Sequence, residues 1–189
     1  MLARFKPQFS TKQYNYRIKL DCTASATTAA AQGGSSEIPA KDGCMNQWMS
    51  NGIWKVRVTA VGPDNNNDPG SPQIGWSVTE DWVNLTGKPL APGDTWTSEQ
   101  QLALTSGNTI SVTNGASTQM NWGNLIYRTF PPGSSWTYQQ RFRQAGLDVN
   151  DKPAKLIVPF DASKQNPRVG APHYTVNPPN YRISLTCTK

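Results

Sequence analysis

The chain has 189 residues, and 18 Lys and Arg against 12 Asp and Glu give it a formal net charge of +6. With 36% hydrophobic residues and seven Trp, this composition excludes an intrinsically disordered chain, and the length suffices for one sizeable core. No apolar run approaches the roughly 18 residues of a membrane span, so we expect none.

The charge is distributed unevenly along the chain. Residues 1–20 hold five bases and no acid, whereas residues 60–100 hold six acids and one base. We therefore predict a basic N-terminal arm over residues 1–13 and a single domain over residues 14–189. Basic side chains bind polyphosphates because each contact releases condensed counterions, although charge that only keeps a protein soluble gives the same pattern. The candidate nucleic-acid-binding residues are Arg4, Lys6, Lys12, Arg17 and Lys19.

Alternation of apolar and polar residues recurs along the whole chain between Gly, Pro, Asn and Asp clusters, which is typical of many short strands. Near the N-terminus, for example, Tyr16 and Ile18 face one way while Arg17 and Lys19 face the other. A minor strand is predicted at residues 109–113. The main strands are predicted at residues 14–22, 52–61, 74–83, 95–104, 119–129, 135–143, 154–160 and 180–188.

Eight main strands joined by long loops predict an all-β fold, either a two-sheet sandwich or a barrel. Of these we expect the eight-stranded antiparallel two-sheet sandwich. Residues 44–51 are expected to form a short helix or turn, and residues 62–70 an exposed loop. The first and last strands have similar sequences, since residues 15–23 and 180–188 agree at seven of nine positions. Chance or the demands that all strands share explain this similarity as well as an internal duplication does.

Three cysteines, Cys22, Cys44 and Cys187, are too few for a disulfide framework, so we expect buried free thiols. A bond between Cys22 and Cys187 is the alternative, and it requires that the first and last strands be neighbours.

The sequence holds little that points to catalysis. His173 is the only imidazole, and we find neither a nucleophile elbow nor a nucleotide-binding glycine loop, so we expect no catalytic residues, no cofactor and no metal site. Adjacent Glu80 and Asp81 would point to opposite faces of a strand, which favours solvated surface acids over the converging carboxylates of a hydrolase. The sequon at Asn84 is not expected to carry a glycan.

The seven Trp residues have two interpretations. Those on alternating strands are expected to fill the core, because a buried Trp removes a large apolar area from water. Exposed Trp or Tyr side chains could instead stack on sugars or form contacts between subunits.

Eight strands with the first and last adjacent, preceded by a basic arm, resemble the single jelly-roll coat proteins of small icosahedral viruses. The resemblance covers the whole chain and implies jelly-roll topology. It also implies a non-enzymatic capsid subunit that assembles with copies of itself and with other capsid subunits, its arm facing viral nucleic acid. Such a protein would be part of the virion, after assembly in the host cytoplasm. The alternative is a carbohydrate-binding, lectin-like or adhesin-like module that uses exposed Trp and the loop at residues 62–73.

Overall fold

The structure is a computed structural model, and it describes residues 2–5, 14–17, 40–65, 73–95, 99–111 and 123–188. The chain divides into two units, Met1–Ala31 and Gln32–Lys189. In the first unit, β1 (Leu2–Phe5) and β2 (Tyr14–Arg17) pair antiparallel, with Leu2 opposite Arg17. The boundary that we placed after residue 13 falls inside this unit.

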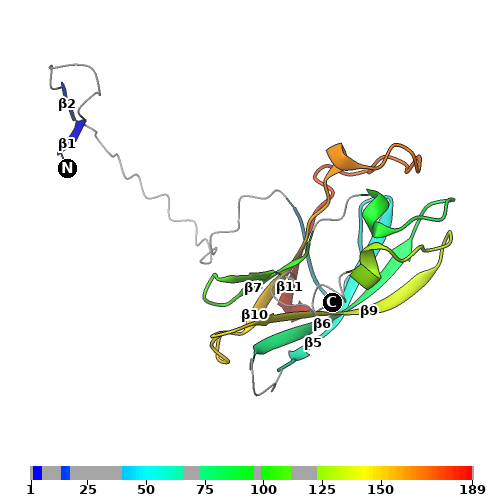
Figure 1. The fold of residues 1–189 in the computed structure, drawn as a ribbon, viewed down its shortest axis with the longest axis horizontal. Helices are drawn as coiled ribbons and strands as arrows, with labels where there is room; N and C mark the ends of the chain where they lie inside the picture. Colours follow the sequence, from blue (N-terminus) through cyan, green and yellow to red (C-terminus); the bar gives the residue numbers. More distant parts are fainter. Residues whose placement is uncertain are drawn as a thin grey trace. The chain divides into compact units, whose positions relative to one another are not determined.

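The second unit is a β-sandwich of two sheets (Figure 1). Its strands are β3 (Lys41–Met45), β4 (Met49–Ser50), β5 (Trp54–Pro63), β6 (Ile74–Asn84), β7 (Gln101–Leu104), β8 (Thr109–Ser111), β9 (Ser135–Gln144), β10 (Pro153–Val158) and β11 (Tyr181–Thr188). The five-stranded sheet has the order β3-β11-β10-β7-β8, and the four-stranded sheet has the order β4-β5-β6-β9. Short 3-10 helices lie at Pro92–Thr95 and Ala162–Lys164. The all-β two-sheet prediction is therefore confirmed.

The long strands follow the predicted alternation, whereas several short segments do not. The predicted strands at 52–61, 74–83, 135–143, 154–160 and 180–188 correspond to β5, β6, β9, β10 and β11. Residues 123–126, expected inside a strand, form one helical turn, which the Tyr127 amide closes by donating to the Gly123 carbonyl over 3.1 Å. Residues 44–51, expected as a helix or turn, contain the end of β3 and all of β4. In both places the segment is too short for a period to be recognised.

The expectation that the first and last strands are neighbours was wrong. β2 pairs with β1, and β11 lies between β10 and β3. Pairing between β3 and β11 is parallel, with Lys41 opposite Tyr181, and the consecutive strands β10 and β11 are antiparallel neighbours in one sheet. The described strands therefore do not follow the order that we predicted, because similar strand sequences say which faces are apolar and not which strand is the partner.

The core between the sheets is rich in aromatic side chains. Trp54, Trp76 and Trp82 are buried on the inner face of the four-stranded sheet, which confirms the core interpretation for these three. The Trp54 ring lies edge-on to Trp82, with centroids 5.8 Å apart, and to Phe130 at 5.3 Å. Edge-to-face pairs of this kind add to the area term, since each buried aromatic already stabilises the fold by about 2–3 kcal/mol.

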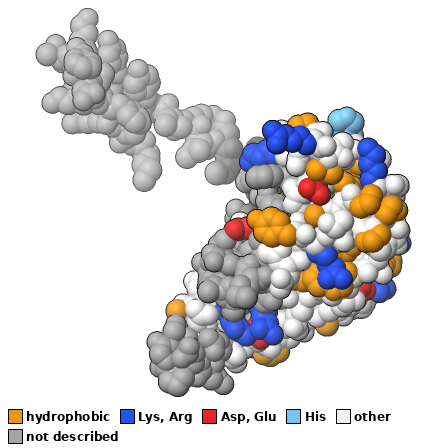
Figure 2. All heavy atoms as spheres, turned by 45° about the vertical axis from the view of Figure 1, so that its right-hand side comes forward, with side chains coloured by type: hydrophobic (Ala, Val, Ile, Leu, Met, Phe, Trp, Pro, Cys, Tyr) orange, Lys and Arg blue, Asp and Glu red, His pale blue; other side chains and the backbone are white. Residues whose placement is uncertain are grey.

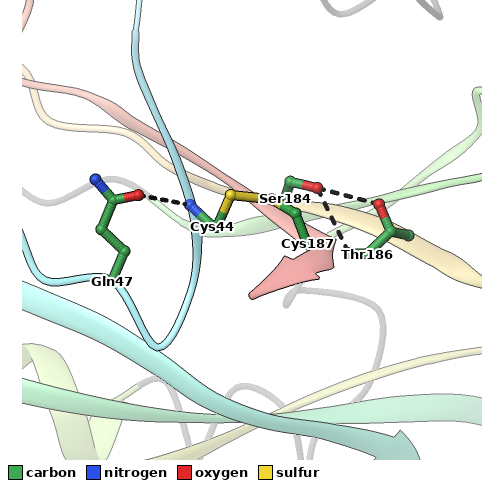
Figure 3. Close-up of a disulfide and its surroundings, with 5 residues drawn as sticks. All are labelled: Cys44, Gln47, Ser184, Thr186 and Cys187. Carbon is green, nitrogen blue, oxygen red and sulfur yellow. Dashed lines mark hydrogen bonds between the residues drawn. A yellow bond between two sulfur atoms is a disulfide. The ribbon is translucent and has the colours of Figure 1, made fainter. Parts of the chain in front are cut away.

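A disulfide between Cys44 and Cys187 joins the edge strand β3 to β11, with Cα atoms 5.2 Å apart (Figure 3). The expectation of free thiols was thus wrong for these two residues, and Cys22 lies outside the described residues. β3 was not predicted as a strand, so the sequence offered no reason to place Cys44 beside Cys187. The backbone N–H of Cys44 also donates to the Gln47 side chain over 3.1 Å, which fixes the turn after β3.

No helix in the described part of the chain is long and apolar enough to cross a bilayer.

Candidate functional site

The predicted nucleic-acid-binding residues fall in the first unit. Arg4 belongs to β1, opposite Asn15, and Arg17 belongs to β2, opposite Leu2. Lys6, Lys12 and Lys19 lie outside the described residues, and so does any grouping of the five side chains. The structure therefore brings the backbones of Arg4 and Arg17 into one small sheet.

The division into units separates the charge. The first unit holds five bases and one acid, a net charge of +4 in 31 residues. The second unit holds 13 bases and 11 acids, a net charge of +2 in the remaining 158 residues. Most of the net positive charge therefore lies outside the sandwich.

One buried side chain, Asn84, organises the loops at one end of the sandwich. Its Oδ1 accepts from the Thr86 amide at 2.9 Å and from the Thr86 hydroxyl at 2.8 Å. Its Nδ2 donates to the carbonyl oxygens of Lys88 at 2.7 Å and Phe130 at 2.9 Å. The Asn84 side chain is wholly buried, and both its oxygen and its nitrogen are hydrogen-bonded. Its amide nitrogen is therefore not accessible for attachment of a glycan in the folded protein.

Exposed basic side chains lie in the loops at this end of the sandwich. Lys88, Arg128 and Arg168 are exposed and lie in the loops after β6, before β9 and after β10. We call these three residues, together with the exposed Tyr127, the basic end. Figure 2 shows Lys and Arg side chains along the upper edge of this unit, beside the pale blue His. His173 is exposed in the same long loop before β11, as its predicted loop position requires.

Glu80 was expected to be a solvated surface acid, and the structure places it wholly inside the core. It does lie on the face opposite Asp81, as predicted, but its face is the inner one because β6 alternates with Trp76, Val78 and Trp82 pointing inward. Asp81 faces outward and pairs with Arg57 at 2.6 Å. These two acids therefore cannot converge on one substrate.

The Glu80 carboxyl has an incomplete set of partners. Its Oε2 accepts from the Trp82 indole N–H at 2.9 Å and from the Gln100 amide at 2.7 Å. Its Oε1 and the Gln100 Oε1 have no hydrogen-bond partner among the described residues. Burial raises the pKa of Glu80 to about 7, and the hydrogen bonds from Trp82 and Gln100 oppose that rise. A carboxyl that keeps its proton can donate where a carboxylate cannot.

A half-buried Trp48 flanks the outer face of the four-stranded sheet. The Lys55 ammonium and the Arg57 guanidinium lie 4.6 and 4.5 Å from the centroid of its ring. Across the sheet, the Thr137 hydroxyl donates to Asp81 over 2.7 Å. This face carries hydroxyls, charges and one aromatic ring, which are the groups that bind sugars.

A pocket of about 310 Å³ lies beside the disulfide and is lined by residues of β3, β10 and β11 and by Gln47. The Arg182 guanidinium on its wall makes two bonds to the Asp42 carboxylate, at 2.6 and 3.0 Å. This pairing is the main reason why the pKa of Asp42 is lowered. The charges of Asp42 and Arg182 are thus matched to each other, and Lys155 adds a further positive charge to the pocket wall.

The comparisons with known proteins assign no family to this chain. No family model and no curated protein matches the chain. Among solved structures, an uncharacterized β-sandwich protein from Clostridium difficile 630 has a TM-score of 0.45 and 10% identity, covering 82% of this chain and 100% of that one. A conserved hypothetical protein from Bacillus anthracis has a TM-score of 0.40 and 15% identity, covering 64% of this chain and 90% of that one. What this chain does must therefore come from its own residues.

Proposed function

We propose that the protein is a structural coat subunit, which assembles with copies of itself and holds nucleic acid with its basic N-terminal segment. The observation that carries the proposal is the separation of charge between the two units. A sandwich with little net charge is suited to packing against copies of itself, whereas a segment of 31 residues with a net charge of +4 is suited to phosphate. No catalytic role is needed for any residue of either unit.

Assembly through a sheet edge has a candidate strand. β9 is ten residues long and pairs with β6 along its length. On its other side it has no partner among the described strands, and it contains no proline. An unpaired edge of this length is a template for a strand of another chain. This route to a shell depends on the sandwich and does not require jelly-roll connectivity.

The Cys44–Cys187 bond fits a particle that leaves the host cell. Disulfides persist in oxidising surroundings and are rare in the cytosol. Under the proposal, a subunit assembled in the host cytoplasm would close this bond as or after the virion is released.

Size-exclusion chromatography with light scattering, followed by electron microscopy, tests the proposal. We expect the full chain to form large particles with single-stranded RNA at low salt and to lose RNA as salt rises. Replacing Arg4, Lys6, Lys12, Arg17 and Lys19 by Gln should abolish RNA packaging. The matched control replaces five bases of the second unit, Lys41, Lys55, Lys152, Lys155 and Lys164, and should keep it. A protein that stays monomeric at every concentration and salt would exclude a coat function.

A second candidate function is sugar binding by the outer face of the four-stranded sheet, and the position of Trp48 beside polar side chains favours it. A glycan array of the full chain, with Trp48→Ala as the variant, separates the two functions. Saturable binding to a glycan that Trp48→Ala abolishes, in a protein that does not assemble, would support a lectin-like module. An array without any bound glycan would exclude it.

A further inference from the structure

We propose that the basic end of the sandwich binds single-stranded nucleic acid. Lys88, Arg128 and Arg168 contact phosphate groups, and the Tyr127 ring stacks on a nucleobase. This inference rests on the proposed function in that it names a second contact for the same nucleic acid. It concerns the sandwich alone and requires nothing of the N-terminal unit.

The positive charge of the basic end is not neutralised by neighbouring acids. In the described part of the chain, none of the three bases lies within salt-bridge distance of a carboxylate. The acids of the same loops are engaged locally. Asp94 accepts from the Ala91 amide at 2.8 Å, and Asp161 accepts from Ser163 and pairs with Lys164. The three bases are therefore left to attract an external anion.

The structure also holds two of the three basic side chains, those of Lys88 and Arg128, in place. The Lys88 ammonium donates to the Gly170 carbonyl over 3.1 Å, which joins the loop after β6 to the loop before β11. The Arg128 guanidinium lies 4.2 Å from the centroid of the Trp136 ring. The buried Asn84 amide donates to the carbonyl oxygens of Lys88 and Phe130, and so joins the two loops that contain these residues. Ordering these side chains before binding reduces the entropy that a phosphate contact would otherwise cost.

Tyr127 gives the reason to expect single strands. Its side chain is 81% exposed, the largest exposure among the large hydrophobic residues in the described part. It directly precedes Arg128 at the end of the helical turn at 123–126. An exposed aromatic ring beside a basic side chain is the combination on which unpaired nucleobases stack. A duplex hides the faces of its nucleobases, and a sulfated polysaccharide has no nucleobases.

Fluorescence anisotropy of a labelled 20-nucleotide poly(U) strand with the full chain tests the inference. We expect the triple variant Lys88→Gln, Arg128→Gln, Arg168→Gln to raise Kd at least about tenfold. It should also reduce the slope of log K against log salt by about 2, since each lost phosphate contact contributes about 0.7. The matched control, Lys55→Gln, Lys152→Gln, Lys155→Gln, removes the same charge from other faces and should raise Kd by less than about threefold. Equal losses in both triple variants would overturn the inference, because net charge alone would then explain binding.

Tyr127→Ala tests the stacking contact in a protein whose charge is unchanged. It should weaken poly(U) binding several-fold and leave heparin binding as it was. Tighter binding of heparin than of poly(U), or an unchanged Kd for poly(U), would overturn the assignment to single-stranded nucleic acid. Circular dichroism melting of each variant verifies that its fold is intact.

Light scattering on the same samples separates this inference from the coat function. A triple variant that assembles but binds RNA weakly supports the inference whatever the arm contributes. A wild-type chain that binds RNA through these residues and never assembles overturns the coat function alone.

Discussion

At each end of the sandwich, one polar side chain joins loops by hydrogen bonds. That side chain is buried at one end and partly exposed at the other. At the basic end, the buried Asn84 bridges the loops that contain Thr86, Lys88 and Phe130. At the other end, the partly exposed Asp151 accepts from the Thr105 hydroxyl and the Ser106 amide, both at 2.9 Å. Water can replace the partners of the partly exposed Asp151, whereas Asn84 itself is wholly buried, so similar numbers of hydrogen bonds should contribute different amounts to stability.

The two ends also differ in how far their charged side chains are neutralised by neighbours. The basic end presents three cations that have no acidic partner among the described residues. At the other end, Asp64 pairs with Arg143 at 2.9 Å, and Asp151 is held by hydroxyl and amide donors. Although desolvation opposes it, these donors together lower the pKa of Asp151. The acids there are bound by donors within the fold, which leaves the basic end as the more attractive surface for an anion.

The largest effect is expected from the disulfide, which clips β3 to the part of β11 farthest from the basic end. Cys44→Ser should destabilise the protein by about 2–5 kcal/mol, because the bond closes a long loop in the unfolded chain. Urea denaturation with and without reductant measures this. Cys187→Ser should have the same effect and the double variant no more, with Cys22→Ser as the control. A wild-type midpoint that reductant does not move would contradict the covalent clip.

The next largest effect is expected at Asn84. Asn84→Ala removes a wholly buried amide together with its hydrogen bonds to Thr86, Lys88 and Phe130, and should cost about 3 kcal/mol in the free energy of unfolding. Loosening of the loops should also weaken poly(U) binding in the folded variant. Denaturant titration measures the first and anisotropy the second, with the exposed Asn124→Ala as the control. If Asn84→Ala cost no more than Asn124→Ala, burial would not distinguish the two ends.

Glu80 lies between the two ends and should make stability depend on pH. Its pKa is about 7 in the folded protein against an ordinary value of 4.5, so the folded state holds the proton more tightly. Its contribution is complete below pH 4.5 and is lost as the pH rises through 7. Glu80→Gln removes this loss, so its free energy of unfolding relative to wild type should be higher at pH 8 than at pH 4.5 by about 3 kcal/mol.

Denaturation of wild type and Glu80→Gln at both pH values measures this difference. Asp81→Asn, on the outer face of the same strand, is the control for the change of charge. Curves of stability against pH that run parallel for wild type and Glu80→Gln would mean that Glu80 titrates normally.

The smallest effect is expected at Asp151. Asp151→Ala should cost about 1 kcal/mol, because water takes over the exposed donors of Ser106 and Thr105. Differential scanning calorimetry of Asp151→Ala and Asn84→Ala compares the contributions of the two side chains to stability directly. A loss as large as that of Asn84→Ala would show that exposure does not set the contribution of such a bridge.

Prediction from the sequence succeeded where one long segment carries its own signal. β5 and β6 alternate over ten and eleven residues, and alternation alone reveals both the strand and its inward Trp side chains. It failed at β3, which has five residues, and at the turn at 123–126. The residues of the basic end were also missed. Its three basic residues lie in three separate loops, and no local pattern links them.

The fate of Glu80 shows the same limit inside a strand that was predicted well. Its position opposite Asp81 follows from the backbone, but a charged residue was expected to choose the solvent side. Trp76, Val78 and Trp82 outweighed it, because a strand turns one whole set of alternate residues inward. Gln100 and the Trp82 indole then supplied two hydrogen bonds.

By itself, the sequence determined an all-β chain, the course of its longest strands, its aromatic core and a basic N-terminal segment, because each follows from the order of neighbouring residues. The tertiary structure decided which strands pair, which cysteines bond, which acid is buried and which bases meet at one end. Those outcomes depend on contacts between residues far apart in the chain, and only packing of the whole sandwich selects among them.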